Sequence, residues 1–282
     1  MTDSESVVVR AMREDDLADA DRLRAVAGWN QMPADWLRIL RYQPDGCFVA
    51  TISDAVVGTV TTTSYPHHVA IGEPVPLAWI GMMLVHPDQR RKGIASALMR
   101  RSVDYLNESG VQCIKLDATP VGEPVYARLG FQAEWRFNRW QRSSDDSPAV
   151  VPSSGPGTLF SEVDLAAFGV DRGHWLNMLA EDSKVVVNNN GFGMLRTGRV
   201  ATYVGPITAD GPDAAGEIAD TLLNGLRGPV VWDMPSPNAA GEQLARERGF
   251  EPVRDLTRMW MGQRLLAPEL KCQFGLSDPG AG

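Results

Sequence analysis

A short run of basic and small residues stands between an apolar segment and an amphipathic one. Its sequence is Arg90-Arg91-Lys92-Gly93-Ile94-Ala95-Ser96. Glycine lets a backbone approach a ligand closely, and the first amides of a helix have no partners within the helix. Cationic side chains beside such a helix start form an anion site, and a pyrophosphate suits it. The alternative interpretation is a solvated basic turn that caps a helix.

The segments around this run have the patterns that such a site needs. Residues 77–85 are almost continuously apolar, as in a buried central strand, and residues 93–107 have the spacing of an amphipathic helix. The same reading predicts strands at 7–10, 47–51, 56–64, 114–118 and 131–140, and helices at 15–27, from 33, and at 123–129. We therefore expect an α/β (α+β) fold with a mixed, mostly antiparallel sheet flanked by helices.

A stretch rich in Ser, Pro, Gly and Asp divides the chain near its middle. We expect a first domain over 1–142, a linker over 143–158, a second domain over 159–266 and a loose tail over 267–282. Segments 115–140 and 231–260 share one order: a strand ending at Asp, Pro-rich punctuation, a short helix, Gly-Phe, and a strand closing on Trp. The two halves therefore read as a duplication, although strand–helix–Gly–strand units are common.

The composition excludes several classes of protein. The 282 residues are 44% hydrophobic and 22% charged, which excludes collagen, coiled coil and long disorder. A net charge of −8 argues against a nucleic-acid partner. Cys47, Cys113 and Cys272 are too widely spaced for a disulfide framework or a zinc site, so we expect a reducing cytoplasm and no metal. No apolar run approaches the roughly 18 residues of a spanning helix, so we expect no membrane partner.

Arg90-x-x-Gly93-x-Ala95, placed after the apolar strand, resembles the acyl-CoA-binding motif of the GNAT superfamily of N-acetyltransferases. Tyr126-x-x-x-Gly130-Phe131, one strand later, strengthens the resemblance, which covers residues 5–140. The second half looks like a degenerate relative of the same domain. The resemblance implies the GNAT fold, with its splayed central sheet, twice in tandem.

The resemblance also implies that acetyl-CoA is the acyl donor. The backbone of the central strand would pair with the pantetheine arm, and a bulge at Gly81 would let the strands splay. The loop amides and cations would hold the pyrophosphate, with a hydroxyl from Ser96. The cofactor residues assigned in this way are Met83, Leu84, Val85, Arg90, Arg91, Lys92, Gly93, Ile94, Ala95 and Ser96.

Tyr126 matches the family tyrosine that protonates the departing CoA thiolate; the alternative is a half-buried core residue. Many members carry a general-base Glu on the central strand, and Trp79 stands at that position here. Asp117, at the end of its strand, is the first candidate for the base, and a turn cap is its other interpretation. His67, His68 and Glu73 are further candidates.

Trp29, Asn30 and Met82 are the expected wall of the acceptor pocket, with Trp36 behind them in the core. His174 and Trp175 either reach the acceptor or pack between the halves. In the second half, residues 205–213 contain two Asp and no cation, so we expect a single CoA site.

The sequence thus predicts an acetyl-CoA-dependent N-acetyltransferase (class 2.3.1) that acts on a primary amine of a small molecule in a direct ternary complex. Three alternatives stay open: a CoA-binding sensor without turnover, a transferase for another acyl-CoA, and a thioester hydrolase. We expect a monomer or a homodimer.

Overall fold

The computed structural model describes residues 6–65, 75–153, 162–265 and 269–282. The elements of the first half are, in chain order, β1 (Val8–Ala11), η1 (Glu14–Asp16), α1 (Leu17–Ala27), α2 (Pro33–Tyr42), η2 (Pro44–Gly46), β2 (Phe48–Ile52), β3 (Ala55–Tyr65), β4 (Leu77–Val85), η3 (Pro87–Gln89), α3 (Ile94–Glu108), β5 (Cys113–Ala118), α4 (Glu123–Arg128) and β6 (Gln132–Arg142). The η elements are single 3₁₀ turns.

The second half repeats this alternation of helices and strands. Its elements are α5 (Glu162–Phe168), α6 (Gly173–Ala180), β7 (Ser183–Asn188), β8 (Gly191–Arg196), β9 (Thr202–Ala209), α7 (Pro212–Leu223), β10 (Val230–Pro235), α8 (Ala239–Glu247), β11 (Glu251–Gly262), η4 (Leu270–Cys272) and β12 (Gln273–Gly275). Within the described ranges, none of the helices combines the length and the apolar character that crossing a bilayer requires.

All described strands join one sheet in the order β1-β2-β3-β4-β5-β11-β6-β10-β9-β8-β7, with β12 added beside β9. Only two of these pairings are parallel, β4 with β5 and β9 with β10. Each parallel pairing covers three residue pairs, after which the strands diverge. The predicted fold class, a mostly antiparallel, splayed sheet flanked by helices and built twice, is confirmed.

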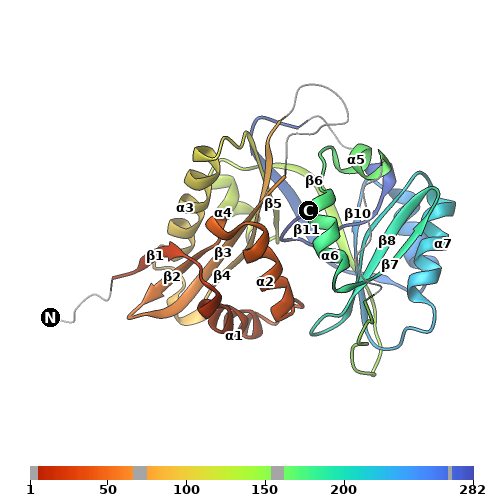
Figure 1. Ribbon diagram of the computed structural model, residues 1–282, viewed down its shortest axis with the longest axis horizontal. Coiled ribbons are helices and arrows are strands. Elements are labelled where there is room, and N and C mark those ends of the chain that lie inside the picture. The colour runs from red at the N-terminus through yellow and green to blue at the C-terminus, as the bar shows by residue number, and fades with distance from the viewer. Residues whose placement is uncertain (1–5, 66–74, 154–161, 266–268) are drawn as a thin grey trace.

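Each half places one long strand, β6 of the first half and β11 of the second, in the other half (Figure 1). β11 pairs with β5 of the first half, β6 pairs with β10 of the second, and the two exchanged strands pair with each other. Trp140 of β6 is therefore buried in the second half's core, beside Trp232. The linker expected at 143–158 stays a prediction. In space, the two halves are not separate, because they share their central strands β6 and β11.

The bulge expected at Gly81 is present, and it changes which face of β4 each residue covers. Before it, Leu77 and Trp79 pack toward α1 and α2, and alternate residues pack toward α3. One extra residue then enters β4 relative to β3, with Met82 at a φ of 48°. Met82 and Leu84 consequently cover the α1 and α2 face, while the side chain of Met83 turns toward α3.

The expectation of a loose tail over 267–282 is wrong for its described part, residues 269–282. Phe274, Leu276 and Ala281 are buried, and β12 pairs with β9. Figure 1 shows this end of the described chain between the two lobes. The Pro, Gly and Ser content that suggested a loop permits close packing: the backbone of Gly280 lies directly against Gly81.

Candidate functional site

The basic loop has the backbone of an anion site. Arg91 and Gly93 adopt left-handed φ values of 62° and 80°, and α3 begins at Ile94. Left-handed residues just before a helix turn successive amides toward one concave space. Among the described residues, the amides of 94–96 have no backbone acceptor. Arg90, Arg91 and Lys92 are exposed, so their charges reach that space.

The edge of β4 beyond the bulge is open toward β5. Parallel pairing stops at Trp79 with Lys115, and within the described part no strand covers the β5 side of Met83–Val85. Unpaired backbone groups on such an edge accept an extended ligand as an added strand. The arrangement matches the expected place for a pantetheine arm that runs from the loop to the splay.

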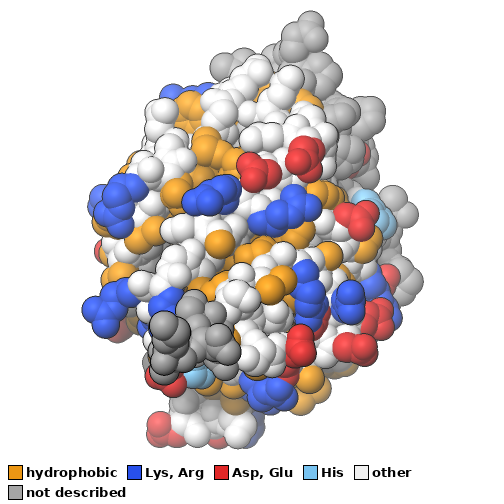
Figure 2. Space-filling view, turned by 90° about the vertical axis from the view of Figure 1, so that its left-hand side faces the viewer, with side chains coloured by type: hydrophobic (Ala, Val, Ile, Leu, Met, Phe, Trp, Pro, Cys, Tyr) orange, Lys and Arg blue, Asp and Glu red, His pale blue; other side chains and the backbone are white. Residues whose placement is uncertain are grey.

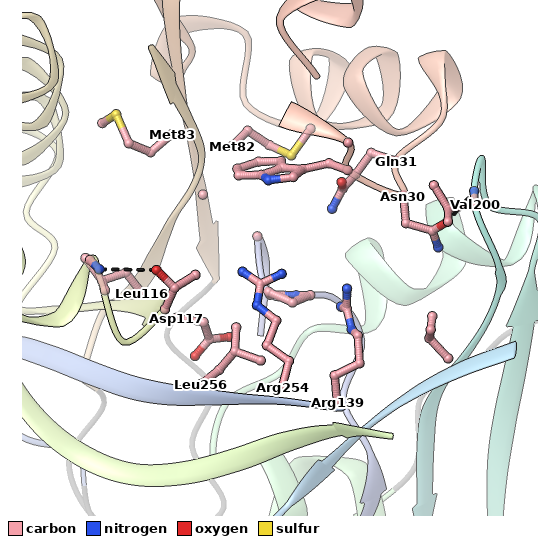
Figure 3. Close-up of a pocket in the computed structure, with 18 of the residues that line it drawn as sticks. Asn30, Gln31, Met82, Met83, Leu116, Asp117, Arg139, Val200, Arg254 and Leu256 are labelled. Atoms are coloured by element: carbon pink, nitrogen blue, oxygen red, sulfur yellow. Dashed lines mark hydrogen bonds between the residues drawn. The ribbon is translucent and has the colours of Figure 1, made fainter. Parts of the chain in front are cut away.

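A pocket of about 460 Å³ opens at this splay (Figure 3). The first half contributes the loop 28–31, the β4 bulge at 80–83 and the residues Leu116, Asp117, Thr119, Gly122 and Tyr126. The exchanged strands contribute Arg139, Gln141, Arg254 and Leu256, and the second half and the tail contribute Val200, Ala201, Pro229, Val231, Pro279 and Gly280. Both predicted catalytic residues and all three predicted acceptor residues therefore share one pocket, whereas the loop 90–96 lies outside it.

Tyr126 is half-buried on α4, edge-on to Phe131 at 6.2 Å between ring centroids. Burial raises the pKa of its phenol above the ordinary value. The hydroxyl therefore stays protonated at neutral pH, as a proton donor to a leaving thiolate must. Its position in the pocket is compatible with the predicted role.

Asp117 is held in a buried ion pair with Arg258 of β11. Both bonds, Nε to Oδ1 and Nη2 to Oδ2, measure 2.9 Å, and the Arg258 guanidinium also lies 4.3 Å from the ring of Trp79 and 4.4 Å from that of Trp135. Burial raises the pKa of Asp117 and the guanidinium opposes that shift. Protonation would leave Arg258 unpaired in a buried site, so this geometry does not favour Asp117 as a base.

Trp79, at the position of the family's glutamate, thus serves as a stacking partner for that pair rather than as a polar group. The other candidate bases, His67, His68 and Glu73, lie outside the described residues.

Asn30 lines the pocket, but its amide is occupied by the second half. Its Nδ2 donates to the Ala201 carbonyl at 2.9 Å, and its Oδ1 accepts from the amides of Val200 and Ala201 at 2.8 and 2.9 Å. Asn30 therefore fastens the segment 199–201 to the first half. Its neighbour Trp29 is half-buried and has its indole in the pocket wall.

The other aromatic residues considered from the sequence are structural. Trp36 is buried in the core, as expected. His174 and Trp175 both pack on Tyr42 with ring centroids 5.3 Å away, so they form an interface between the halves.

Sequence reasoning missed the pocket's arginines. Arg139 and Arg254 lie on the exchanged strands, and the pattern of a strand does not reveal which neighbour it pairs with. The internal repeat was the available signal, because Asp117 and Asp233 are its matching strand ends, and the exchanged strands bring Arg258 and Arg139 to them.

Within the residues that the structure describes, the second half has no equivalent open slot. β12 pairs with β9 through Ile207 and Thr208, on the edge that corresponds to Met83–Val85 of β4. The Trp232 indole fixes it by donating to the Phe274 carbonyl at 2.7 Å. The helix after β9, α7, begins with Pro212 and Asp213 instead of a basic loop. The chain itself thus fills the place that a pantetheine arm would take.

Charge on the surface is mixed. On the face in Figure 2, Lys and Arg side chains alternate with Asp, Glu and apolar side chains, without a continuous basic area.

Models of known families match both halves of the chain. A model described as "Acetyltransferase (GNAT) family" matches residues 12–131, and one described as "Acetyltransferase (GNAT) domain" matches residues 160–275. An uncharacterized N-acetyltransferase of Streptomyces avermitilis is 38% identical over 107 residues, which are 37% of this chain and 24% of that protein. The chain thus spans about a quarter of that relative's length.

An acetyltransferase of Sodalis glossinidius is 31% identical over 135 residues, 45% of this chain and 87% of that protein. Among solved structures, a putative acetyltransferase from Pyrococcus horikoshii has a TM-score of 0.81 at 22% identity and covers 100% of this chain and 98% of its own. A GCN5-related N-acetyltransferase from Sphaerobacter thermophilus has a TM-score of 0.60 at 13% identity and covers 94% and 98%. With two matching domains and this shared fold, the chain belongs to the GNAT family of acetyltransferases.

Proposed function

We propose that the chain transfers an acetyl group from acetyl-CoA to a primary amine of a small molecule, directly within a ternary complex. One observation carries the proposal: the open edge of β4 connects the basic loop 90–96 to a pocket that holds Tyr126 and the wall of Trp29 and Met82. A donor bound along that edge would present its thioester at the β4 bulge, and an acceptor in the pocket would meet it there.

In this mechanism the amine nitrogen attacks the thioester carbonyl carbon, and the carbon–sulfur bond breaks as the amide bond forms. Tyr126 donates its proton to the departing sulfur, and the proton that the acceptor nitrogen loses returns through solvent water to the Tyr126 phenolate, which restores the acid. Orienting both reactants in one pocket supplies much of the acceleration, because the reaction becomes effectively unimolecular. The ion pair of Asp117 with Arg258 argues against a carboxylate base, so we propose that the amine enters in its neutral form.

The same pair supports a second candidate function, a CoA-binding sensor with little turnover. A sensor needs the phosphate loop and the open edge of β4 but no base, and the described pocket offers no carboxylate outside an ion pair.

Two measurements separate these functions. Titration calorimetry with acetyl-CoA tests binding, and CoA-thiol release across primary amines, amino acids and aminoglycosides tests transfer. We expect binding together with thiol release and an acetylated amine. Binding without release for any amine would favour the sensor, release without an acetylated amine would indicate hydrolysis, and absence of binding would overturn both candidates. The same assay with propionyl-CoA and longer acyl-CoA donors tests the choice of acyl group.

A further inference from the structure

Two arginines face each other on the floor of the pocket. Arg139 of β6 and Arg254 of β11 are direct cross-strand partners, and a bulge at Val253 sets this register. Bulges re-aim side chains beside functional sites, whereas like charges placed directly opposite are destabilising. Figure 3 shows both guanidinium groups reaching into the pocket from below. Two cations therefore lie side by side at a place where their repulsion lowers the stability of the fold.

Only one of the two is neutralised by the protein. Arg139 donates Nε and Nη2 to the two oxygens of buried Asp233, at 2.7 and 2.6 Å. The side chain of Arg254 makes no hydrogen bond or ion pair with any residue in the described part of the chain. Arg254 is an exposed residue, but partial burial of its guanidinium and the neighbouring Arg139 lower its pKa, because both disfavour the charged form, and Asp233 opposes part of that shift. An anionic ligand bound beside Arg254 would stabilise the charged form of its guanidinium.

No other charge on the pocket wall offsets Arg254. Asp117 is the acidic residue among the lining residues, and Arg258 already pairs with it. The cations of the loop 90–96 do not line the pocket, so the donor's pyrophosphate would bind away from Arg254. The uncompensated charge of the described lining is thus one positive charge, at the acceptor end.

The opposite wall offers a hydrogen-bond acceptor without a partner. Gln31 points its Nε2 at the carboxylate of Asp278, 3.4 Å away, which leaves Oε1 on the other side of the amide. That oxygen is buried and has no hydrogen-bond partner among the described residues. An unsatisfied buried oxygen costs free energy, and an N–H group of a ligand would remove that cost. Gln31 and Met82 lie across the pocket from Arg254 in Figure 3.

On the basis of the proposed function, we infer that the acceptor is an amine that also carries a carboxylate, bound by Arg254, with its amino group at Gln31 Oε1. A guanidinium presents two parallel N–H groups that match a carboxylate, and one free cation balances one negative charge. The indole of Trp29 and the Met82 side chain add an apolar wall for the rest of the molecule. Polycationic amines are disfavoured, because their charge would be repelled by Arg254.

Carboxylate binding is tested without the acyl donor. Ligand-observed NMR would compare phenylacetate, phenylacetamide and phenyl phosphate on the wild type, Arg254→Gln and Arg136→Gln. Arg136 is the control because it is, like Arg254, an exposed arginine on an exchanged strand, but it does not line the pocket. We expect phenylacetate to bind at least tenfold more tightly than phenylacetamide, Arg254→Gln to remove that preference, and Arg136→Gln to keep it. Three results would overturn the inference: equal binding of phenylacetate and phenylacetamide to the wild type, phenylacetate binding to Arg254→Gln as tightly as to the wild type, or tighter binding of phenyl phosphate than of phenylacetate.

The acceptor itself is tested by CoA release with phenylalanine, phenylalaninamide and phenethylamine. We expect the highest kcat/KM with the amino acid, and a loss of at least tenfold with Arg254→Gln for that acceptor alone. Higher kcat/KM with either neutral-tailed amine would overturn the inference and leave the proposed function intact. Carboxylate binding at Arg254 without any acetyl-CoA binding would remove the proposed function instead.

Discussion

Asp117 on β5 and Arg258 on β11 form a buried ion pair that joins the two halves of the chain, with both hydrogen bonds at 2.9 Å. Asp233 on β10 and Arg139 on β6 form its counterpart. In each case the aspartate ends a repeated strand and the arginine comes from the exchanged strand of the other half. The two pairs therefore secure the exchange of β6 and β11.

We predict that Asp117→Asn lowers the free energy of unfolding by about 3–5 kcal/mol, because it leaves a buried guanidinium without its counter-charge. Both side chains are almost fully inaccessible, at 0% for Asp117 and 2% for Arg258, so solvent does not screen the pair. Urea unfolding of the purified chain measures the change. A loss below about 1 kcal/mol would show that the pair does not secure the strands.

The double variant Asp117→Leu, Arg258→Met tests whether Asp117 has only a structural role or also acts as the general base. Replacing both partners with apolar side chains removes the unpaired charge, so we expect much of the stability to return. We also expect turnover per folded molecule to stay within tenfold of the wild type. A stable double variant without turnover would restore Asp117 as the general base.

The sequence was sufficient for the features that local patterns carry. The loop 90–96 and the splayed β4 were predictable, because a basic run before a helix and an apolar run with an internal glycine act over a few residues, whereas Tyr126 was singled out by the resemblance to the family. The use of Asn30 as a clamp was not, because an amide gives no sign of its partner 171 residues away.

The exchange of β6 and β11 was hidden for a related reason. Alternation along a strand reports which faces are buried, but not which strand lies beside it. The burial of β12 depends on the free edge of β9 in the folded second half, and the burial of Gly280 depends on close contact with Gly81 of the first half. The unpaired charge of Arg254 in the pocket was hidden as well, because the pocket is built from strands of two halves.

Gly93→Val is predicted to abolish acetyl-CoA binding. Gly93 has a φ of 80°, which a β-branched residue adopts only with strain, so the loop would change its backbone and scatter its amides. Titration calorimetry measures the loss.

Gly110→Val is the matched control. Gly110 follows α3 with a φ of 76°, and at both glycines a Cβ would meet nothing within 4 Å. The two variants therefore carry similar strain, and only Gly93 lies at the proposed site. Unchanged binding in Gly93→Val, or equal loss in both variants, would remove the loop as the pyrophosphate site.

Tyr126→Phe is predicted to lower kcat at least tenfold, about 1.4 kcal/mol of barrier, with little change in acetyl-CoA affinity. Because burial raises the pKa of this phenol above its ordinary value of 10.0, the proton donor stays loaded through neutral and mildly alkaline pH. The kcat of the wild type should therefore show no decline from this group until the pH exceeds 10. A decline below that pH that disappears in Tyr126→Phe, or a fully active variant, would contradict the acid role.

One chain is predicted to bind a single acetyl-CoA molecule. The two halves share a fold, so two sites are the simple expectation from the duplication. In the second half, however, β12 occupies the edge of β9, and Asp213 stands where the first half has its basic loop. A donor would have to displace a paired strand and the Phe274 side chain, which is fully buried, and place its phosphates beside a carboxylate. We therefore expect calorimetry to give one acetyl-CoA per chain for the wild type and none for Gly93→Val. A stoichiometry of two in the wild type, with one site left in Gly93→Val, would show that β12 yields its place to the donor.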